Sequence, residues 1–123
     1  MKRILVVDDD RTTLRMIRLQ LEGAGYEVET ARDGAAALSR LAGGRFDLVL
    51  LDVWMPGMDG LEVLSRLRGA PSQPRVIVMT ADDAPETLLR AVREHAFRYV
   101  NKPVEPAELA QIAGRAGRAM RDG

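Results

Sequence analysis

Five short runs of mainly apolar residues recur along this chain, and a stretch with helical periodicity follows each of them. The runs cover about residues 3–8, 26–31, 47–52, 75–80 and 98–101. Apolar runs of this length between polar residues are typical of buried strands, and the periodic stretches are typical of amphipathic helices. The expected helices cover about residues 11–23, 34–41 and 61–68, a segment that starts near Pro85, and residues 106–120. This alternation predicts an α/β fold with a parallel sheet and helices on both of its faces.

Polar side chains stand at the ends of four of these runs. They are Asp8 and Asp9 after the first run, Asp52 in the third, Thr80 in the fourth and Lys102 after the fifth. The second run alternates between apolar and polar residues and ends in Ala31, which indicates a strand at the edge of the sheet. The strand order 2-1-3-4-5, known from other doubly wound folds, accounts for this pattern. It places the first and third strands together at the reversal of strand order, where such sheets bind their ligands.

Three carboxylates, a hydroxyl and an ammonium at one sheet edge predict a site for a cation and a phosphoryl group. Carboxylates that crowd together repel each other, and a hard divalent cation neutralises them. Mg²⁺ takes carboxylate and phosphate oxygens together with water, and Mn²⁺ can substitute because it favours the same oxygen ligands. A carboxylate can also act as a nucleophile and form an acyl phosphate. Such a transfer depends mainly on positioning and charge neutralisation, which Lys102 and Thr80 would support.

Some residues of this set have simpler explanations. Asp10 is expected only to cap the first helix, because Asp is favoured at that position. Asp8 or Asp9 could share that role, and Thr80 could be an ordinary residue at a strand end. Lys102 is one of two lysines among 18 basic residues, which makes it noticeable but could reflect chance. Together, these residues indicate a site for a cation and a phosphoryl group more specifically than any one of them does alone.

Length and charge narrow the class of protein. With 123 residues, the chain is expected to form a single domain over residues 1–123. Its 18 basic and 18 acidic residues cancel, so the overall charge does not indicate a nucleic-acid partner. No apolar run approaches the roughly 20 residues that cross a bilayer, and the first apolar run is too short for a signal peptide. We therefore expect a cytoplasmic protein with no direct membrane or nucleic-acid partner.

Four segments resemble the receiver domain of two-component response regulators, and the resemblance spans essentially the whole chain. In order, the matching segments are Val6 to Asp9, Asp52 to Gly60, Val78 to Ala81 and Tyr99 to Pro103. Their order and spacing agree with that family. The resemblance implies a flavodoxin-like (βα)5 fold with a doubly wound, five-stranded parallel sheet. It also implies a phospho-accepting signalling switch rather than an enzyme that acts on external substrates.

The resemblance assigns a role to the residues at the strand ends. It implies that Asp52 accepts a phosphoryl group from the phosphohistidine of a histidine kinase or a phosphotransfer protein. Asp9 and Asp52 would bind Mg²⁺ directly, together with the backbone carbonyl of Trp54. Asp8 would act on the metal largely through water. Lys102 would pair first with Asp52 and then with its phosphoryl group.

The family also implies a route from the acceptor to a partner. Thr80 would move toward the phosphoryl group, and Tyr99 would rotate inward behind it. The change would reach the face built from the fourth helix, the fifth strand and the fifth helix. That face would control an output domain or partner protein and could mediate a homodimer. The cognate kinase, the output partner and the oligomeric state do not follow from the sequence.

Three other functions compete with this interpretation. A haloacid dehalogenase-like phosphatase also uses an aspartyl nucleophile, but it needs a second acid two residues later, where this chain has Trp54. A nucleotide-binding module is disfavoured because no glycine-rich phosphate-binding motif follows a strand. A degenerate receiver that serves only as an interaction module is disfavoured because the acceptor, the other acids, the threonine and the lysine are all present.

Overall fold

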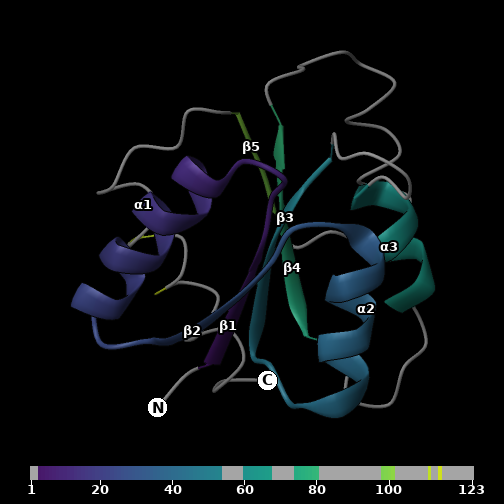
Figure 1. The fold of residues 1–123 in the computed structure, drawn as a ribbon, viewed down its shortest axis with the longest axis horizontal. Coiled ribbons are helices and arrows are strands. Elements are labelled where there is room, and N and C mark those ends of the chain that lie inside the picture. Colours follow the sequence, from purple (N-terminus) through teal and green to yellow (C-terminus); the bar gives the residue numbers. More distant parts are fainter. Residues whose placement is uncertain are drawn as a thin grey trace.

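The computed structural model describes residues 3–53, 60–67, 74–80, 98–101, 111 and 114. Within these residues, parallel strands form one sheet, and helices pack on both of its faces (Figure 1). The strands are β1 (Arg3–Val7), β2 (Glu27–Ala31), β3 (Leu48–Asp52), β4 (Arg75–Thr80) and β5 (Arg98–Asn101). The helices are α1 (Arg11–Gly23), α2 (Gly34–Gly43) and α3 (Gly60–Leu67).

In the part of the chain that the structure describes, the five strands lie in the order β2-β1-β3-β4-β5, and neighbouring strands are parallel. The predicted α/β class, the strand order 2-1-3-4-5 and the edge position of the second strand are therefore confirmed. The chain order reverses between β1 and β3, because β2 lies on one side of β1 and the later strands extend the sheet on the other side. The carboxyl ends of β1 and β3 consequently meet where open sheets of this type bind ligands.

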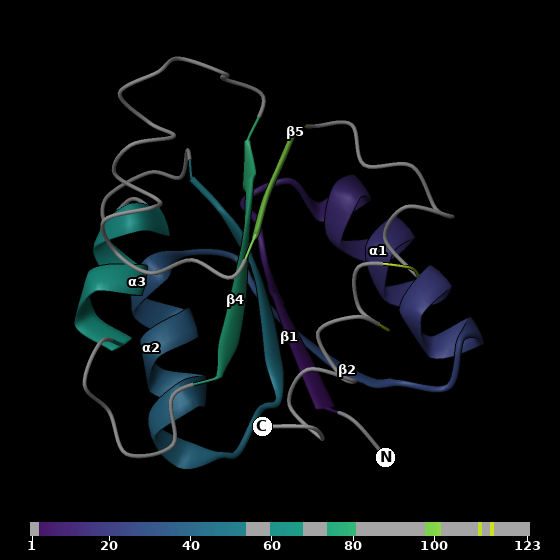
Figure 2. The ribbon, with the colours of Figure 1, turned by 180° about the vertical axis from the view of Figure 1, so that it is seen from behind.

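Among the described residues, the side chains of the strands alternate between two apolar cores, one on each face of the sheet. Figure 2 shows α1 on one face and α2 with α3 on the other. In β1, Ile4 and Val6 belong to the core under α1, whereas Leu5 and Val7 belong to the core under α2 and α3. The buried stripe of α1 consists of the predicted residues Leu14, Ile17 and Leu21. Every residue of β3 is buried, because this central strand has both of its faces covered.

Aspartates fix the starts of α1 and α2. The Asp10 carboxylate accepts hydrogen bonds from the backbone N–H of Thr12 at 3.3 Å and from the Thr13 hydroxyl at 2.6 Å. The Asp33 carboxylate accepts one from the Ala36 N–H at 2.7 Å. These bonds satisfy N–H groups that have no partner within the helix. The capping role predicted for Asp10 is confirmed, so the start of α1 does not need Asp8 or Asp9 as its cap.

The element boundaries follow the sequence pattern within one or two residues. The first helix has the predicted bounds, whereas α2 continues to Gly43 and α3 begins at Gly60. The helices expected from near Pro85 and over 106–120 lie outside the described residues, except that residues 111 and 114 are helical. Among the described helices, none has the length and apolar character that crossing a lipid bilayer requires.

Candidate metal centre

The strand register brings Asp8 and Asp52 to neighbouring positions at the carboxyl ends of β1 and β3. Val7 lies beside Leu51, so Asp8 and Asp52 are the next residues on the two strands. Both aspartates continue the alternate residues of their strands that face α1. The Asp8 N–H also donates a hydrogen bond to the Ala31 carbonyl at 3.1 Å, which extends the pairing of β1 with β2 by one residue.

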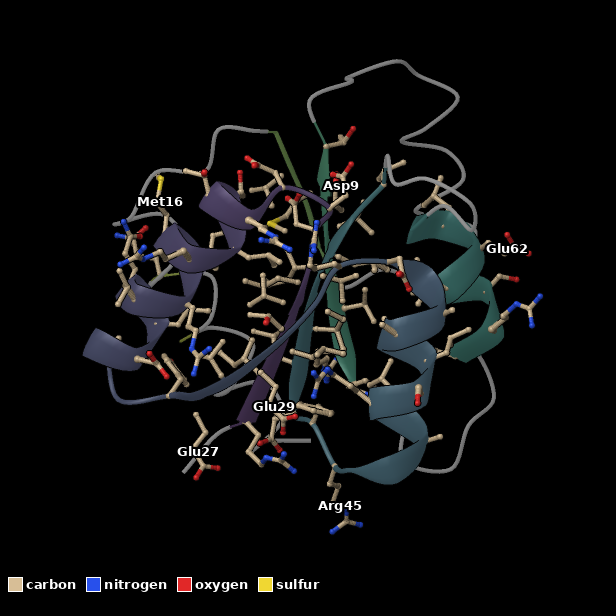
Figure 3. All side chains as sticks on the ribbon, in the orientation of Figure 1. Asp9, Met16, Glu27, Glu29, Arg45 and Glu62 are labelled. Carbon is tan, nitrogen blue, oxygen red and sulfur yellow. The ribbon has the colours of Figure 1, made fainter. Side chains whose placement is uncertain are left out.

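Asp9 completes a cluster of three carboxylates. Asp8, Asp9 and Asp52 each offer one oxygen, and these oxygens lie within 4.8 Å of one another. Asp8 and Asp52 are buried, with 0% and 3% of their surface exposed, whereas Asp9 is exposed. Figure 3 labels Asp9 at the upper end of the sheet, between α1 and the pair α2 and α3. The cluster is therefore closed by protein at two of its carboxylates and open to solvent at the third.

The chemistry of this donor set fits a hard divalent cation. All three groups are carboxylates, which are the ligands that Mg²⁺ and Mn²⁺ favour in proteins. Three negative charges at this spacing repel one another, more strongly where burial lowers the local dielectric. A divalent cation would relieve that repulsion. The three acids that the sequence singled out are thus brought together in an arrangement that could bind a metal ion.

The backbone at the start of α1 holds the buried carboxylate of Asp8. Its Oδ1 atom accepts a hydrogen bond from the Asp10 N–H at 3.0 Å. Hydrogen bonds to an ionised acceptor are stronger than neutral ones, and the amino end of a helix favours negative charge. One aspartate run thus performs two tasks, since Asp10 caps α1 with its side chain and orients Asp8 with its backbone.

Thr80 lies on the opposite side of Asp52 from the other acids. Asp52 is beside Met79 in the register, so Thr80 is the next residue on β4, and its side chain is fully buried. Thr80 lies beside Asn101 of β5, and the backbone of Tyr99 belongs to the same strand. The polar ends of β1, β3 and β4 are therefore adjacent, as the sequence predicted. Lys102, Trp54 and the side chain of Tyr99 lie outside the described residues.

Gly60 is a residue of this region to which the sequence interpretation gave no role. It is the first residue of α3, and its N–H donates a hydrogen bond to the Val53 carbonyl at 2.9 Å. A Cβ atom on Gly60 would overlap the Asp52 carbonyl oxygen and would lie 2.8 Å from the carbonyl carbon of that residue. The missing side chain lets α3 pack against the backbone of the central aspartate. The sequence signal that could have drawn attention to Gly60 was a glycine at the start of an amphipathic helix, because glycine has a low intrinsic helix propensity.

Comparison with known proteins identifies the family. The model of the response regulator receiver domain family matches residues 4–113. The uncharacterized transcriptional regulatory protein YkoG of Bacillus subtilis is 43% identical over 102 residues, which cover 83% of this chain and 45% of YkoG. Response regulator MprA of Mycobacterium tuberculosis is 44% identical over 101 residues, which cover 82% of this chain and 44% of MprA. The chain thus spans less than half the length of either relative.

Solved structures share the fold over nearly the whole chain. A CheY-like response regulator receiver domain protein from Methanospirillum hungatei has a TM-score of 0.92 and is 31% identical, covering 100% of this chain and 99% of that one. Response regulator TrrA from Thermotoga maritima, in complex with Mg²⁺-BeF, has a TM-score of 0.85 and is 36% identical, covering 94% and 99%. Sequence and structure agree that the chain belongs to the response regulator receiver domain family, the phosphoryl-accepting switches of two-component regulatory systems.

Proposed function

We propose that this chain is a Mg²⁺-dependent phosphoryl acceptor in which Asp52 takes the phosphoryl group from a phosphohistidine. The observation that carries the proposal is the convergence of Asp8, Asp9 and Asp52, whose carboxylate oxygens lie within 4.8 Å of one another. Asp52 is the central member, because β3 lies between β1, which leads into the other two acids, and β4, which ends in Thr80. An acceptor at this position has carboxylates on one side and a hydroxyl on the other.

The proposal assigns the metal to the same acids. Asp9 and Asp52 would hold Mg²⁺ directly, with the backbone carbonyl of Trp54, and Mn²⁺ could replace the Mg²⁺ ion. Asp8 would act on the ion through water, and the hydrogen bond from the Asp10 N–H at 3.0 Å orients its carboxylate. When bound, the ion supplies positive charge that offsets both the carboxylates and the oxygens of the transferring phosphoryl group.

The chemical step is a substitution at phosphorus. A carboxylate oxygen of Asp52 attacks the phosphorus atom, and the new O–P bond forms as the P–N bond of the phosphohistidine breaks. The imidazole nitrogen leaves with the bonding electron pair, and the product on this chain is an acyl phosphate. Lys102 supplies a positive charge to the phosphoryl oxygens, and the Thr80 hydroxyl donates a hydrogen bond to one of them.

The phosphoryl group then acts as a signal. Thr80 moves toward it, and Tyr99 follows by rotating inward. The pairing of β4 with β5 supports this coupling, because it joins the backbone of Thr80 to the strand that contains Tyr99. The response reaches the face made by the fourth helix, β5 and the fifth helix. In this proposal, residues 1–123 form one receiver domain in the cytoplasm that acts on an output domain or partner protein and performs no chemistry on external substrates.

The test uses Trp54, the one tryptophan of the chain, which follows Asp52 by two residues. Mg²⁺ is expected to change its fluorescence, and beryllium fluoride, a phosphoryl analogue, is expected to change it further only when Mg²⁺ is present. Asp52→Asn should abolish the second change. Asp33→Asn should keep both changes, because Asn also caps helices and Asp33 lies outside the acid cluster. A beryllium fluoride response that persists in Asp52→Asn would contradict the proposal.

A further inference from the structure

Four arginines line a shallow groove where α1 packs beside β2 (Figure 1). The groove has a volume of about 240 Å³. Its lining residues are Arg11, Leu14, Arg15, Arg18, Thr30 and Arg32. Among the residues that the structure describes, no carboxylate lines this groove. The groove therefore concentrates positive charge on a chain whose net charge is zero.

The acidic residues of β2 lie on the face of the strand that points away from this groove. Glu27 and Glu29 alternate with Val28, which belongs to the core under α1, so their side chains lie on the opposite face. The Glu29 carboxylate pairs with Arg3 and, at 3.0 Å, with Arg40 of α2. The carboxylates of β2 thus neutralise arginines on the α2 side of the sheet and leave the groove positively charged.

The helix itself neutralises one of the four groove arginines. Arg18 pairs with Glu22 at 3.3 Å, one turn along α1, and both side chains of this pair are exposed. Within the described part of the chain, no ion pair involves Arg11, Arg15 or Arg32. Each of these three guanidinium groups can form two parallel hydrogen bonds with a phosphate group.

The arginines of α1 are poorly placed for the stability of the isolated helix. Arg11 is its first residue, and the first turn has no acidic residue, although the positive end of the helix dipole disfavours a cation there. Arg15 has a like charge four residues before it, at Arg11, and another three residues after it, at Arg18, and both spacings destabilise a helix. Departures from local rules that gather in one place are expected at functional sites.

We propose that this groove binds a condensed phosphate chain, either free as an inorganic polyphosphate or as the triphosphate of a nucleotide. Arg11, Arg15 and Arg18 lie on successive turns of α1, and about 10 Å along the helix axis separates the first from the last. A chain of linked phosphates presents negative charge along this whole row. Arg32 and the Thr30 hydroxyl supply further hydrogen-bond donors from the β2 side of the groove.

The size of the groove and the charge of the chain narrow the class of ligand. The groove is smaller than the roughly 300–1,000 Å³ of typical small-molecule pockets, so it has room for a phosphate chain but not also for a base and its sugar. The net charge of zero does not favour a nucleic acid, which is bound by domains with an excess of basic residues. The proposal does not depend on the role of Asp52.

The test is calorimetric titration of the chain with sodium tripolyphosphate in chelator, so that no metal ion can bring phosphate to the acid cluster. Binding should weaken as salt is raised, because exposed charges are screened. Orthophosphate should bind at least about tenfold more weakly, since it contacts fewer of the arginines. The double variant Arg15→Gln, Arg32→Gln should lose about tenfold or more in affinity for tripolyphosphate, since two exposed charge pairs are lost.

Titrations with ATP and AMP distinguish the two sources of the phosphate chain. AMP should bind at least about tenfold more weakly than tripolyphosphate, because it has a single phosphate. An ATP affinity equal to that of tripolyphosphate would assign the groove to the phosphate chain from either source. An ATP affinity well below that of tripolyphosphate would assign the groove to the free chain. AMP that binds as tightly as ATP would overturn the proposal, because the base and sugar would then account for binding.

The matched control is Arg45→Gln, which removes the same charge from an exposed site outside the groove. It should bind tripolyphosphate as the wild type does. Circular dichroism checks that every variant is folded, which is expected because the substituted side chains are exposed. An Arg15→Gln, Arg32→Gln chain that binds tripolyphosphate as tightly as Arg45→Gln does would overturn the proposal. A DNA duplex that binds through Arg15 and Arg32 more tightly than tripolyphosphate would overturn it as well.

Discussion

At the scale of single residues, Gly60 packs against the backbone of Asp52 and Val53 with no room for a Cβ atom. Asp52 belongs to β3, whose residues are all buried between two layers of helices, so its backbone cannot move aside without disturbing both cores. The same glycine donates its N–H to the Val53 carbonyl. The position of the central aspartate thus depends on a residue that has no functional group of its own.

We therefore expect Gly60→Ala to lower the free energy of unfolding by about 1–3 kcal/mol, the usual cost of overpacking. It should also slow phosphorylation by acetyl phosphate, because Asp52 is displaced. Gly23→Ala is the matched control, since a Cβ there meets no atom within 4 Å, and alanine should be neutral or stabilise α1 by up to about 1 kcal/mol. Urea titrations measure both values, and equal effects at the two positions would show that the close packing at Gly60 has no energetic consequence.

At the scale of elements, the site depends on where β1 and β3 end relative to each other. The register that aligns Val7 with Leu51 brings the following aspartates together, and a slip of one residue would turn one carboxylate to the other face of the sheet. Because the carboxylates of Asp8, Asp9 and Asp52 lie close together, we expect them to repel one another when no metal ion is bound.

Asp9→Asn tests that repulsion. In chelator, the variant should melt about 2 °C or more above the wild type, because one of three crowded charges is gone. In excess Mg²⁺ the order should reverse, because an ion that binds the folded state stabilises it more when it binds more tightly, and the variant has lost the Asp9 carboxylate. Glu62→Gln, an exposed acid on α3 (Figure 3), should show no such dependence on Mg²⁺. If Asp9→Asn melts at a lower temperature than the wild type in chelator, the result would contradict the expected repulsion among the three carboxylates.

Local sequence patterns were sufficient to predict where the helices and strands lie along the chain, but not the register in which the strands pair. The bounds of α1 were predictable, because Asp10 caps its start and Gly25, with a φ of +98°, follows its end. The start of the sheet depends instead on Arg3, whose N–H donates to the Asp47 carboxylate at 2.9 Å and whose guanidinium lies 4.7 Å from the Phe46 ring centroid. These contacts join residues more than 40 positions apart, so no local pattern predicts them.

At the scale of the whole molecule, the reversal of strand order between β1 and β3 determines where the acid cluster lies. The order could be anticipated because polar residues stand at the ends of the first, third and fourth strands, whereas the second strand ends in Ala31. The distances among the acids could not be anticipated, since they depend on the twist and packing of the complete sheet.

The most direct test of the central claim is the intact mass of the chain after incubation with acetyl phosphate and Mg²⁺, followed by peptide mapping. The account predicts a gain of about 80 Da, one phosphoryl group, located on Asp52. The gain should be absent in chelator and in Asp52→Asn, and present in Asp33→Asn. A wild-type chain that gains no mass, or an Asp52→Asn chain that gains as much as the wild type, would contradict the assignment of Asp52 as the acceptor.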